Sequence, residues 1–559
     1  MKLNRRAAMA AIGATGLAAG PACADTSGGA FLHGVASGDP AMDGAVLWTR
    51  FTGSGNPTRG STTILSWEVA EDPRFRAVVA DGFGHTDHGR DHTLKAVVTR
   101  LKPGTEYWYR FTHRHSGTVS PVGRFKTLPE TSSTEPVHLA VASCALWPGG
   151  LFTAYDAIAR LDQCDAIVHL GDYTYEYGAA EGDYGMRDGL RLGRIPVPAH
   201  ETVTLDDYRA RLAQYRTDPM LQAAHARAAW IVTFDDHEIA NDPWAEGAQN
   251  HQPETEGTYA ARKAAALKAW YEWMPIREPA PGARLEQAVQ RSFRFGRSAA
   301  LHMLETRLIA RSKQLEVEDI VSETGLDVAR LNDPARTLLG AAQIGLLEGR
   351  VRAAVEDGVA WQVLGNQTIM ARVASPDVDR ALGREAVDAM IPASPEYRRR
   401  RSEAIRTLGR LGAPLNLDQW DGYPAERERL YAALKATGAR TVVVSGDSHA
   451  HWANDLRDGA GDLRGVEFGV TAVSSPVSSI SYSFRGADMT RIIPEQSPEV
   501  RFCEFETRGY LRLTLSPDYA TGVLAGVSTV EQAAYEPVTV ATFRSEALGR
   551  GQTQLSRID

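Results

Sequence analysis

The stretch Ala166–Tyr177, AIVHLGDYTYEY, begins with four mainly apolar residues and runs into Leu170-Gly171-Asp172. This pattern predicts a short buried strand that is ended by a glycine. Asp172 and Tyr175 then follow at the carboxyl end of the strand, which is the edge where ligands collect in open α/β sheets. A carboxylate and a phenol at that edge offer oxygen ligands to a metal ion. Taken alone, the stretch is explained more simply by an aspartate that caps a turn, with a tyrosine packed beside it.

Four other strand-like segments also end in residues that can bind metals. In chain order, the residues at the five strand ends are Cys144, Asp172 with Tyr175, Asp235-Asp236-His237, Asn366, and Asp447 with His449. We expect these side chains to lie together, because the carboxyl ends of parallel strands meet at one edge of a sheet. The recurrence favours a metal centre over five unrelated turns.

The donors fall into two chemical kinds. Thiolate, phenolate and imidazole suit a redox-type transition metal such as iron, whereas carboxylate and amide oxygens suit calcium, magnesium or manganese. Asp172 could bridge two ions, since two-metal hydrolytic sites hold their ions about 3.5–4 Å apart. Such a pair of ions binds a phosphoryl group and generates hydroxide near neutral pH.

The chain divides into two regions with different patterns. Residues 31–128 are rich in strand-forming residues separated by Gly, Asp and Pro, and the turn at 101–107 leads into Tyr107 like the tyrosine corner of fibronectin-type sandwiches. We therefore predict an N-terminal fibronectin-like β-sandwich over 31–128, followed by a polar linker. Strands and helical segments alternate over 137–545, which predicts a larger α/β domain with a parallel sheet.

Residues 1–24 have the features of an export signal. Lys2 and the Arg5–Arg6 pair precede a weakly apolar stretch, and Ala22-Cys23-Ala24 fits a small-x-small cleavage site. The arginine pair indicates a signal of the twin-arginine type, although Ala8 stands where a bulky residue is usual. No later run is long and apolar enough to span a membrane. We expect a periplasmic or secreted protein that uses the twin-arginine export machinery.

Composition excludes several other classes. The 559 residues are 43% hydrophobic and 23% charged, as in a soluble protein of two or more domains. The net charge is −8, and no basic run or patterned basic helix suggests nucleic-acid binding. Removal of the signal leaves three cysteines, an odd number that keeps at least one thiol out of any disulfide within the chain. Cys144 is the candidate for another role.

The motifs of the strand ends resemble a known family. GDYTY (171–175), DDHE (235–238), GNQ (365–367) and GDSH (446–449) resemble the metallophosphoesterase superfamily, and most closely its alkaline phosphatase D (PhoD-like) family. The resemblance covers most of the chain, because the segments 31–40, 46–50, 208–222 and 304–307 follow the family's order. In that family a cysteine stands where purple acid phosphatases have an aspartate, as Cys144 does here. Its members are commonly exported by the twin-arginine route.

The resemblance implies a ligand for each strand end. A ferric ion, Fe(3+), would be bound by Cys144, Asp172, Tyr175 and His449. A second ion, Ca(2+), would be bound by Asp172, Asp236 and Asp447, with Asn366 as a further oxygen ligand or phosphate contact. His237 matches the superfamily's histidine beside the substrate, where an imidazole can give a proton to the leaving oxygen.

Other positions bear less directly on the ligands. Arg307 is either a phosphate clamp or part of a buried structural ion pair, and three further histidines are interpreted as core or surface residues: His33, His169 and His302. The chain departs from the family pattern at Phe234, Asn241–Asp242 and Glu305. None of these positions is a proposed ligand, so the departures concern substrate preference.

The sequence therefore predicts an exported phosphoesterase that hydrolyses phosphate mono- or diesters with metal-activated water, without a covalent enzyme intermediate. One alternative is a diesterase of the phospholipase D type that acts on phospholipids. Another is a non-catalytic exported binding module whose metals only stabilise the fold. His237 argues against the module, because that residue is not needed to bind either ion.

Overall fold

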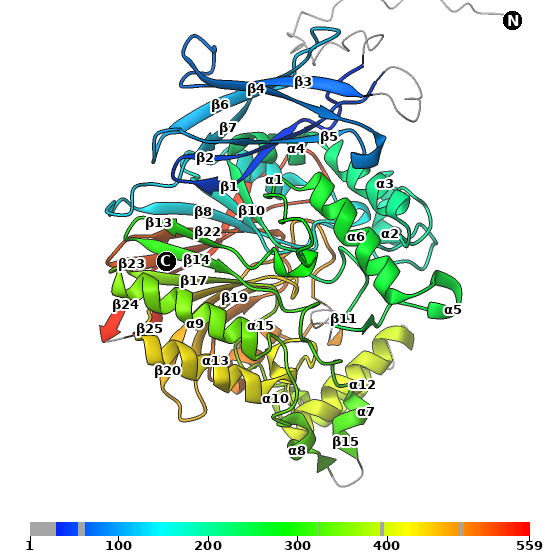
Figure 1. Ribbon diagram of the computed structural model, residues 1–559. Coiled ribbons are helices and arrows are strands. Elements are labelled where there is room, and N and C mark those ends of the chain that lie inside the picture. The colour runs from blue at the N-terminus through cyan, green and yellow to red at the C-terminus, as the bar shows by residue number, and fades with distance from the viewer. Residues whose placement is uncertain are drawn as a thin grey trace, which may run out of the picture.

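The computed structural model describes residues 29–53, 62–322, 325–391, 396–478, 480, 483, 484, 486–549 and 551–559. The export signal expected at residues 1–24 lies outside these described residues. The expected fold class, an N-terminal β-sandwich followed by a layered α/β region, is confirmed (Figure 1). The exact domain boundaries stay predictions.

The N-terminal region consists of two sets of strands packed face to face. Their bounds are β1 Val35–Ala41, β2 Gly44–Arg50, β3 Thr63–Ala70, β4 Val78–Thr86, β5 Thr93–Val98, β6 Glu106–His113 and β7 Gly123–Lys126. The order is β4–β3–β6–β7 in one set and β1–β2–β5 in the other, and apolar residues such as Leu47 and Leu65 form the core between them. The hydroxyl of Tyr107 accepts a 3.0 Å hydrogen bond from the backbone N–H of Lys102, so the predicted tyrosine corner is confirmed.

One sheet of this sandwich continues into the rest of the molecule. β1 pairs in parallel with β10 (Ala229–Val232), with Ser37 opposite Ala229. The strands β1, β2 and β5 are therefore the end of a ten-stranded sheet. This continuity is not predictable from local sequence patterns, because the two paired strands lie far apart along the chain.

Two large sheets form the centre of the α/β region. Their order is β25–β24–β23–β22–β8–β9–β10–β1–β2–β5 in the ten-stranded sheet and β13–β14–β17–β18–β20–β19–β21 in the seven-stranded sheet. The bounds are β8 Val137–Ala142, β9 Ala166–His169, β13 Ser292–Phe295, β14 Ala299–Met303, β17 Trp361–Asn366, β18 Thr441–Ser445, β19 His451–Arg457, β20 Leu463–Gly469, β21 Val500–Glu504, β22 Gly509–Leu515, β23 Tyr519–Val527, β24 Pro537–Gly549 and β25 Gln552–Arg557. A single apolar cluster joins Val141 and Val168 of the first sheet to Val363 and Val444 of the second, so the main core lies between the sheets.

The expectation that the five site strands share one sheet is wrong. β8, β9 and β10 belong to the ten-stranded sheet, whereas β17 and β18 belong to the seven-stranded sheet. Each sheet is covered on one face by helices and on the other by its partner sheet, so both produce the same continuous apolar runs in the sequence. Their carboxyl ends still meet, because Ser143 after β8 pairs in parallel with Ala472 after β20.

Helices cover the two outer faces. The ten-stranded sheet packs against α1 Thr153–Ala159, α3 Leu205–Arg216, α4 Pro219–Arg227 and α6 Tyr259–Trp273, and the seven-stranded sheet against α9 Ala341–Glu356, α13 Pro424–Thr437 and α15 Met489–Gln496. Shorter or peripheral elements are α2 Met186–Leu192, α5 Pro253–Glu256, α7 Val317–Ile320, α8 Val328–Leu331, α10 Val378–Leu382, α11 Arg384–Met390, α12 Glu396–Leu411, and the strand pairs β11 Pro243–Trp244 with β12 Gly247–Ala248 and β15 Val321–Ser322 with β16 Gly325–Leu326. In the described part of the chain, no helix has the length and hydropathy needed to cross a membrane.

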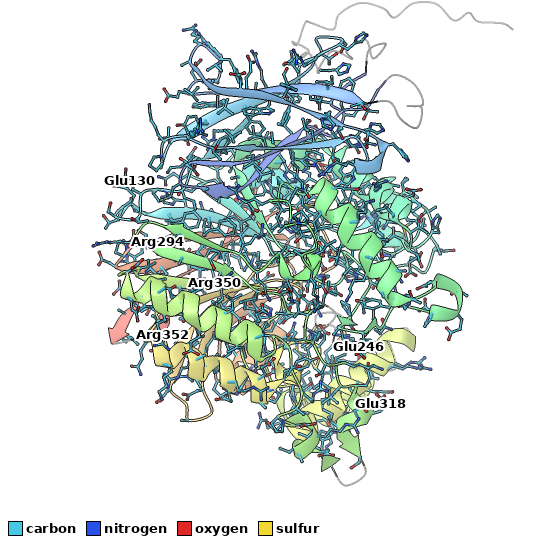
Figure 2. The ribbon with its side chains drawn as sticks, in the orientation of Figure 1. Glu130, Glu246, Arg294, Glu318, Arg350 and Arg352 are labelled. Atoms are coloured by element: carbon cyan, nitrogen blue, oxygen red, sulfur yellow. The ribbon has the colours of Figure 1, made fainter. Side chains whose placement is uncertain are left out.

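Charged side chains fix the outer helix α9 to the edge of its sheet. Figure 2 shows Arg350 and Arg352 on α9 and Arg294 on the neighbouring strand β13. Arg294 pairs with Asp357 at the end of α9, and Arg350 donates a 2.9 Å hydrogen bond to the backbone carbonyl of Gln290. These contacts hold the layer that covers β14 and β17, the strands that lead toward the site.

Candidate metal centre

Every predicted site residue lies at the carboxyl end of one of five strands. Cys144 follows β8, Asp172 and Tyr175 follow β9, and Asp236 and His237 follow β10, whereas Asn366 ends β17 and Asp447 and His449 lie between β18 and β19. The three strands β8, β9 and β10 are parallel neighbours, and so are β17 and β18. The two sheets thus bring residues from distant parts of the chain to a common edge.

The backbone at this edge has an uncommon conformation. Cys144, Asp172, Asp447 and His449 have φ angles of 60°, 56°, 62° and 54°, in the left-handed region that residues other than glycine rarely occupy. Such residues persist only where the surrounding structure determines the conformation, and they concentrate at functional sites. Four of the seven predicted ligands share this property.

Two residues hold the ends of β9 and β10 together. Gly171 has a φ of 104°, and a Cβ at this position would lie 2.2 Å from the backbone nitrogen of Asp235, so only glycine fits. The buried carboxylate of Glu238 accepts hydrogen bonds from the backbone N–H groups of Asp172 (3.0 Å), Tyr173 (2.7 Å) and Asp235 (2.8 Å). Glu238 thereby fixes the turn that presents the side chain of Asp172.

Among the described residues, three groups of side chains have potential ligand atoms within 4.8 Å of one another. They are Cys144 with Asp172 and His449; Asp172 with Asp236 and His237; and Asp172 with Asp235, Asp236 and Asp447. Asp172 is the member common to all three. The structure therefore brings together six of the eight predicted site residues in these groups, and Tyr175 joins them through its hydroxyl.

The first half of the centre contains the thiol, the phenol and an imidazole. The Tyr175 hydroxyl donates a 2.8 Å hydrogen bond to Asp172 and lies 3.3 Å from Nε2 of His449. Nδ1 of His449 lies 2.8 Å from the backbone carbonyl of Pro476, which fixes the proton on Nδ1 and leaves the Nε2 lone pair toward Tyr175. The Ser475 hydroxyl lies 2.8 Å from the Tyr175 oxygen and 2.9 Å from the carbonyl oxygen of Cys144.

The second half contains carboxylates and one arginine. Arg307 is fully buried; its Nε binds Asp235 and its Nη1 lies 2.6 Å from Asp418. Its Nη2 lies 3.6 Å from carboxylate oxygens of both Asp236 and Asp447. Within the described structure, this Nη2 and Oδ1 of Asp236 are buried without a hydrogen-bond partner. Arg307 thus forms the buried ion pair that was one of its two interpretations from the sequence. Its Nη2 still faces the carboxylates of the site.

Asn366 is held by structural contacts. Its Oδ1 accepts a 3.1 Å hydrogen bond from Nε1 of Trp420, and its Nδ2 donates to the carbonyl of Thr368 and to the hydroxyl of Ser445. These bonds orient a fully buried amide but give no sign of a ligand role, so that role stays a prediction.

His237 is oriented by a buried carboxylate that the sequence did not single out. Its Nδ1 lies 2.8 Å from Oε2 of Glu176, while Oε1 of Glu176 accepts 2.8 Å hydrogen bonds from the backbone of Asn241 and from Nδ2 of Asn250. Burial acts to lower the pKa of His237, but the carboxylates of Asp236, Glu176 and Asp172 raise it well above its usual value. The ring is thus fixed with Nε2 toward Asp236, 3.6 Å from its Oδ2.

Burial strongly affects the ionisation of the donors. Burial, and next the charge of Asp172, raises the pKa of the Cys144 thiol and of the Tyr175 hydroxyl well above their usual values. Burial followed by Asp236 raises the pKa of Asp172, and burial raises the pKa of Asp447 to about 6. These effects oppose the anionic forms, whereas a bound cation favours them. The donor set is therefore one that a metal ion fits.

The other three histidines are all buried. Burial lowers the pKa of His33 and His169 to about 3 and that of His302 to about 4. His169 pairs with the Tyr155 hydroxyl at 2.7 Å, and His302 with Gln362 at 3.1 Å. Neutral, hydrogen-bonded side chains of this kind are core residues. Of the two interpretations from the sequence, core or surface, the structure supports the core.

Comparison with known families decides what kind of protein has this arrangement. Residues 139–524 match the family model described as PhoD-like phosphatase, and residues 18–129 match the model of the N-terminal domain of PhoD-like phosphatases. The chain belongs to the PhoD-like phosphatase family. Alkaline phosphatase D of Bacillus subtilis (strain 168) is 34% identical to this PhoD-like phosphatase over 501 residues, which are 87% of this chain and 76% of the relative.

Solved structures agree with this assignment. The structure of PhoD is 30% identical, covers 96% of this chain and 93% of its own, and superposes with a TM-score of 0.77. A purple acid phosphatase from yellow lupin (Lupinus luteus) seeds is 12% identical, covers 90% of this chain and 73% of its own, and has a TM-score of 0.51, which shows a shared fold. The PhoD-like phosphatase described here is thus an enzyme, a phosphoesterase with the metallophosphoesterase fold, and the expected family resemblance is confirmed.

Proposed function

We propose that this PhoD-like phosphatase is an exported, metal-dependent enzyme that hydrolyses phosphate mono- or diesters at a two-metal centre. The observation that carries the proposal is the position of Asp172, which belongs to all three groups of potential metal ligands. A carboxylate shared between a thiol–imidazole group and a carboxylate group is suited to bridge two different ions.

The two halves of the centre would hold two kinds of metal. Cys144, Asp172, Tyr175 and His449 would bind ferric iron, and Asp172, Asp236 and Asp447 would bind calcium, with Asn366 as a further oxygen ligand or phosphate contact. When bound, the ions would supply an activated water and stabilise the charge that develops on the phosphoryl oxygens.

Side chains of the protein supply the remaining functions. Nη2 of Arg307, which makes no hydrogen bond within the described residues, faces the carboxylate group and can bind a phosphoryl oxygen. His237, with its Nδ1 held by Glu176, presents Nε2 to the site and donates a proton to the leaving oxygen. No side chain is required to form a covalent bond to phosphorus.

Metal analysis and turnover test the proposal together. The purified enzyme is expected to contain about one iron per chain and a second, more exchangeable ion, and to be coloured by charge transfer from Tyr175 or Cys144 to iron. Chelation should abolish turnover of an aryl phosphate, and addition of calcium and iron should restore it. A colourless, fully active preparation that contains only zinc would contradict the metal assignment. Turnover that chelators never affect would contradict the metal mechanism.

Export by the twin-arginine machinery to the periplasm or the medium is the second part of the proposal. It is supported by the Arg5–Arg6 pair and by the small-x-small site at residues 22–24. Replacement of both arginines by lysine should leave the enzyme in the cytoplasm, because the export receptor reads this pair. Fractionation with the single substitution Lys2→Arg as a control measures the effect, and unchanged export of the double variant would argue against this route.

A further inference from the structure

Two tyrosines flank the candidate centre on the side that is open to solvent. Tyr177 and Tyr184 pack against each other with ring centroids 5.7 Å apart and ring planes at 62°. The Tyr177 ring lies 5.3 Å from the His237 ring, and the Tyr184 ring is stacked on the His449 ring at 6.4 Å. The pair therefore contacts both the proposed proton donor and a proposed iron ligand, although no ligand or catalytic role falls to either tyrosine.

Exposure separates these two rings from the residues beneath them. Cys144, Asp172 and Tyr175 are each at most 1% exposed and form the floor of the centre. Tyr177 and Tyr184 are partly exposed, as are Asp447 and His449. A substrate that places its phosphoryl group above the floor would therefore have its organic group beside the two rings.

The rings are held in fixed positions. The Tyr177 hydroxyl donates to Oδ1 of Asn241 at 3.3 Å, and the Tyr184 hydroxyl lies 3.2 Å from Nδ1 of His449. Two aromatic planes inclined at 62° form a corner in which a flat group can stack on one ring while its edge meets the other. Rigid rings bind such a group with little loss of conformational entropy.

We propose that Tyr177 and Tyr184 form a binding subsite for the organic group of the ester, and that this group carries a flat ring. This inference rests on the proposed function, because His237 places the leaving oxygen next to the Tyr177 ring. The substrate class is thus a phosphate ester of a ring-bearing alcohol.

Two substrates separate ring recognition from chemistry. Benzyl phosphate and ethyl phosphate have leaving alcohols of similar acidity, but only the first carries a ring. The enzyme should show a kcat/KM for benzyl phosphate about ten-fold above that for ethyl phosphate, as expected for one or two aromatic contacts. Tyr177→Leu and Tyr184→Leu should each reduce this ratio about three-fold, mainly through KM. Tyr177→Phe and Tyr184→Phe should keep most of it.

Controls distinguish loss of the subsite from loss of the fold. Phe83→Leu removes an exposed aromatic ring on β4 of the sandwich and should not change the ratio. Competitive inhibition by benzylphosphonate should weaken in the Leu variants, while inhibition by inorganic phosphate is kept, and metal content verifies that the site is intact. A benzyl-to-ethyl ratio near one in the native enzyme, or a ratio that both Leu variants leave unchanged, overturns the subsite alone. Absence of turnover and of phosphate inhibition with both ions bound overturns the proposed function as well.

Discussion

The two halves of the candidate centre lie at the same edge but stabilise their side chains by different means. Around Cys144, Tyr175 and His449, apart from the shared carboxylate of Asp172, the hydrogen-bond partners include neutral groups: hydroxyls of Ser143 and Ser475 and the carbonyl of Pro476. Around Asp235, Asp236 and Asp447 the neighbours are charged, and Arg307 and His237 compensate the carboxylates. The half that contains Cys144 can therefore exist as uncharged thiol, phenol and imidazole without a metal. The carboxylate half needs the positive charges of Arg307 and His237.

The two halves consequently respond differently to loss of a ligand. In the neutral half, metal binding must displace protons from donors whose pKa burial has raised, so affinity there depends on each anionic donor. In the charged half, Asp236 stays ionised: burial acts to raise its pKa, but His237 and Arg307 hold it below its usual value. Substitutions in each half, and at the residue common to both, test this distinction.

The largest effect is expected for Asp172→Asn. This change removes the carboxylate that all three groups share, so both ions should be lost or weakened together. Activity should fall by about a thousand-fold or more, since several kcal/mol of charge stabilisation disappear. Metal content per chain, measured beside kcat/KM, checks the result. Loss of only one ion would show that Asp172 belongs to a single half.

His237→Ala comes next in size and should leave both ions in place. Because a poor leaving group needs a proton as it departs, the rate on alkyl phosphates should fall about 10²–10⁴-fold. Nitrophenyl phosphate, whose leaving group is stable as an anion, should be affected far less. Loss of an ion would make His237 a ligand, and equal loss on both substrates would make it a residue that positions the substrate.

Cys144→Ser tests the neutral half alone. Without the thiolate, the affinity for iron should fall at least about ten-fold, so iron occupancy should decrease. The absorption band should shift, while calcium is kept. If Cys144 were only a small buried residue, the change would cost about 1–3 kcal/mol of stability and leave the metals unaltered. Cys164→Ser is the matched control, because that thiol is also buried but lies away from the centre.

The smallest of the four effects is expected for Glu176→Gln. The amide keeps the shape but weakens the bond that holds Nδ1 of His237, so alkyl phosphate turnover should fall about ten-fold, typical for a partner that orients a histidine. A double-mutant cycle with His237→Ala measures the coupling: Glu176→Gln should have little further effect once the imidazole is gone. Additive losses would show that Glu176 acts independently of His237.

The predictable part of this molecule is the part encoded in short segments. The tyrosine corner at Tyr107 and the glycine-ended strand before Asp172 each depend on neighbours within a few residues, and both are present in the structure. Likewise, the recurrence of metal-binding residue types after apolar runs pointed to residues that the structure brings together in three groups of potential ligands.

The remainder depends on pairings between distant segments. Glu176 lies inside the very stretch that predicted the site, yet its partner His237 follows another strand, so no local pattern distinguishes Glu176 from a surface carboxylate. The division of the site strands between two sheets is hidden for a similar reason, because strands covered on both faces have the same apolar sequence in either sheet. The pairing of β1 with β10 is equally non-local.

The position of β8 within its sheet bears on when the proposed metals can bind. This strand, which leads to Cys144, lies between β9 and β22, and β22 (Gly509–Leu515) follows all of the proposed ligands along the chain. Ser475, which supports both Cys144 and Tyr175, also comes late. A chain that has not yet reached β22 therefore has every proposed ligand but an unpaired edge at β8. We expect metal binding at the proposed centre to await the pairing of β22 with β8, and a truncation before residue 509 to weaken it.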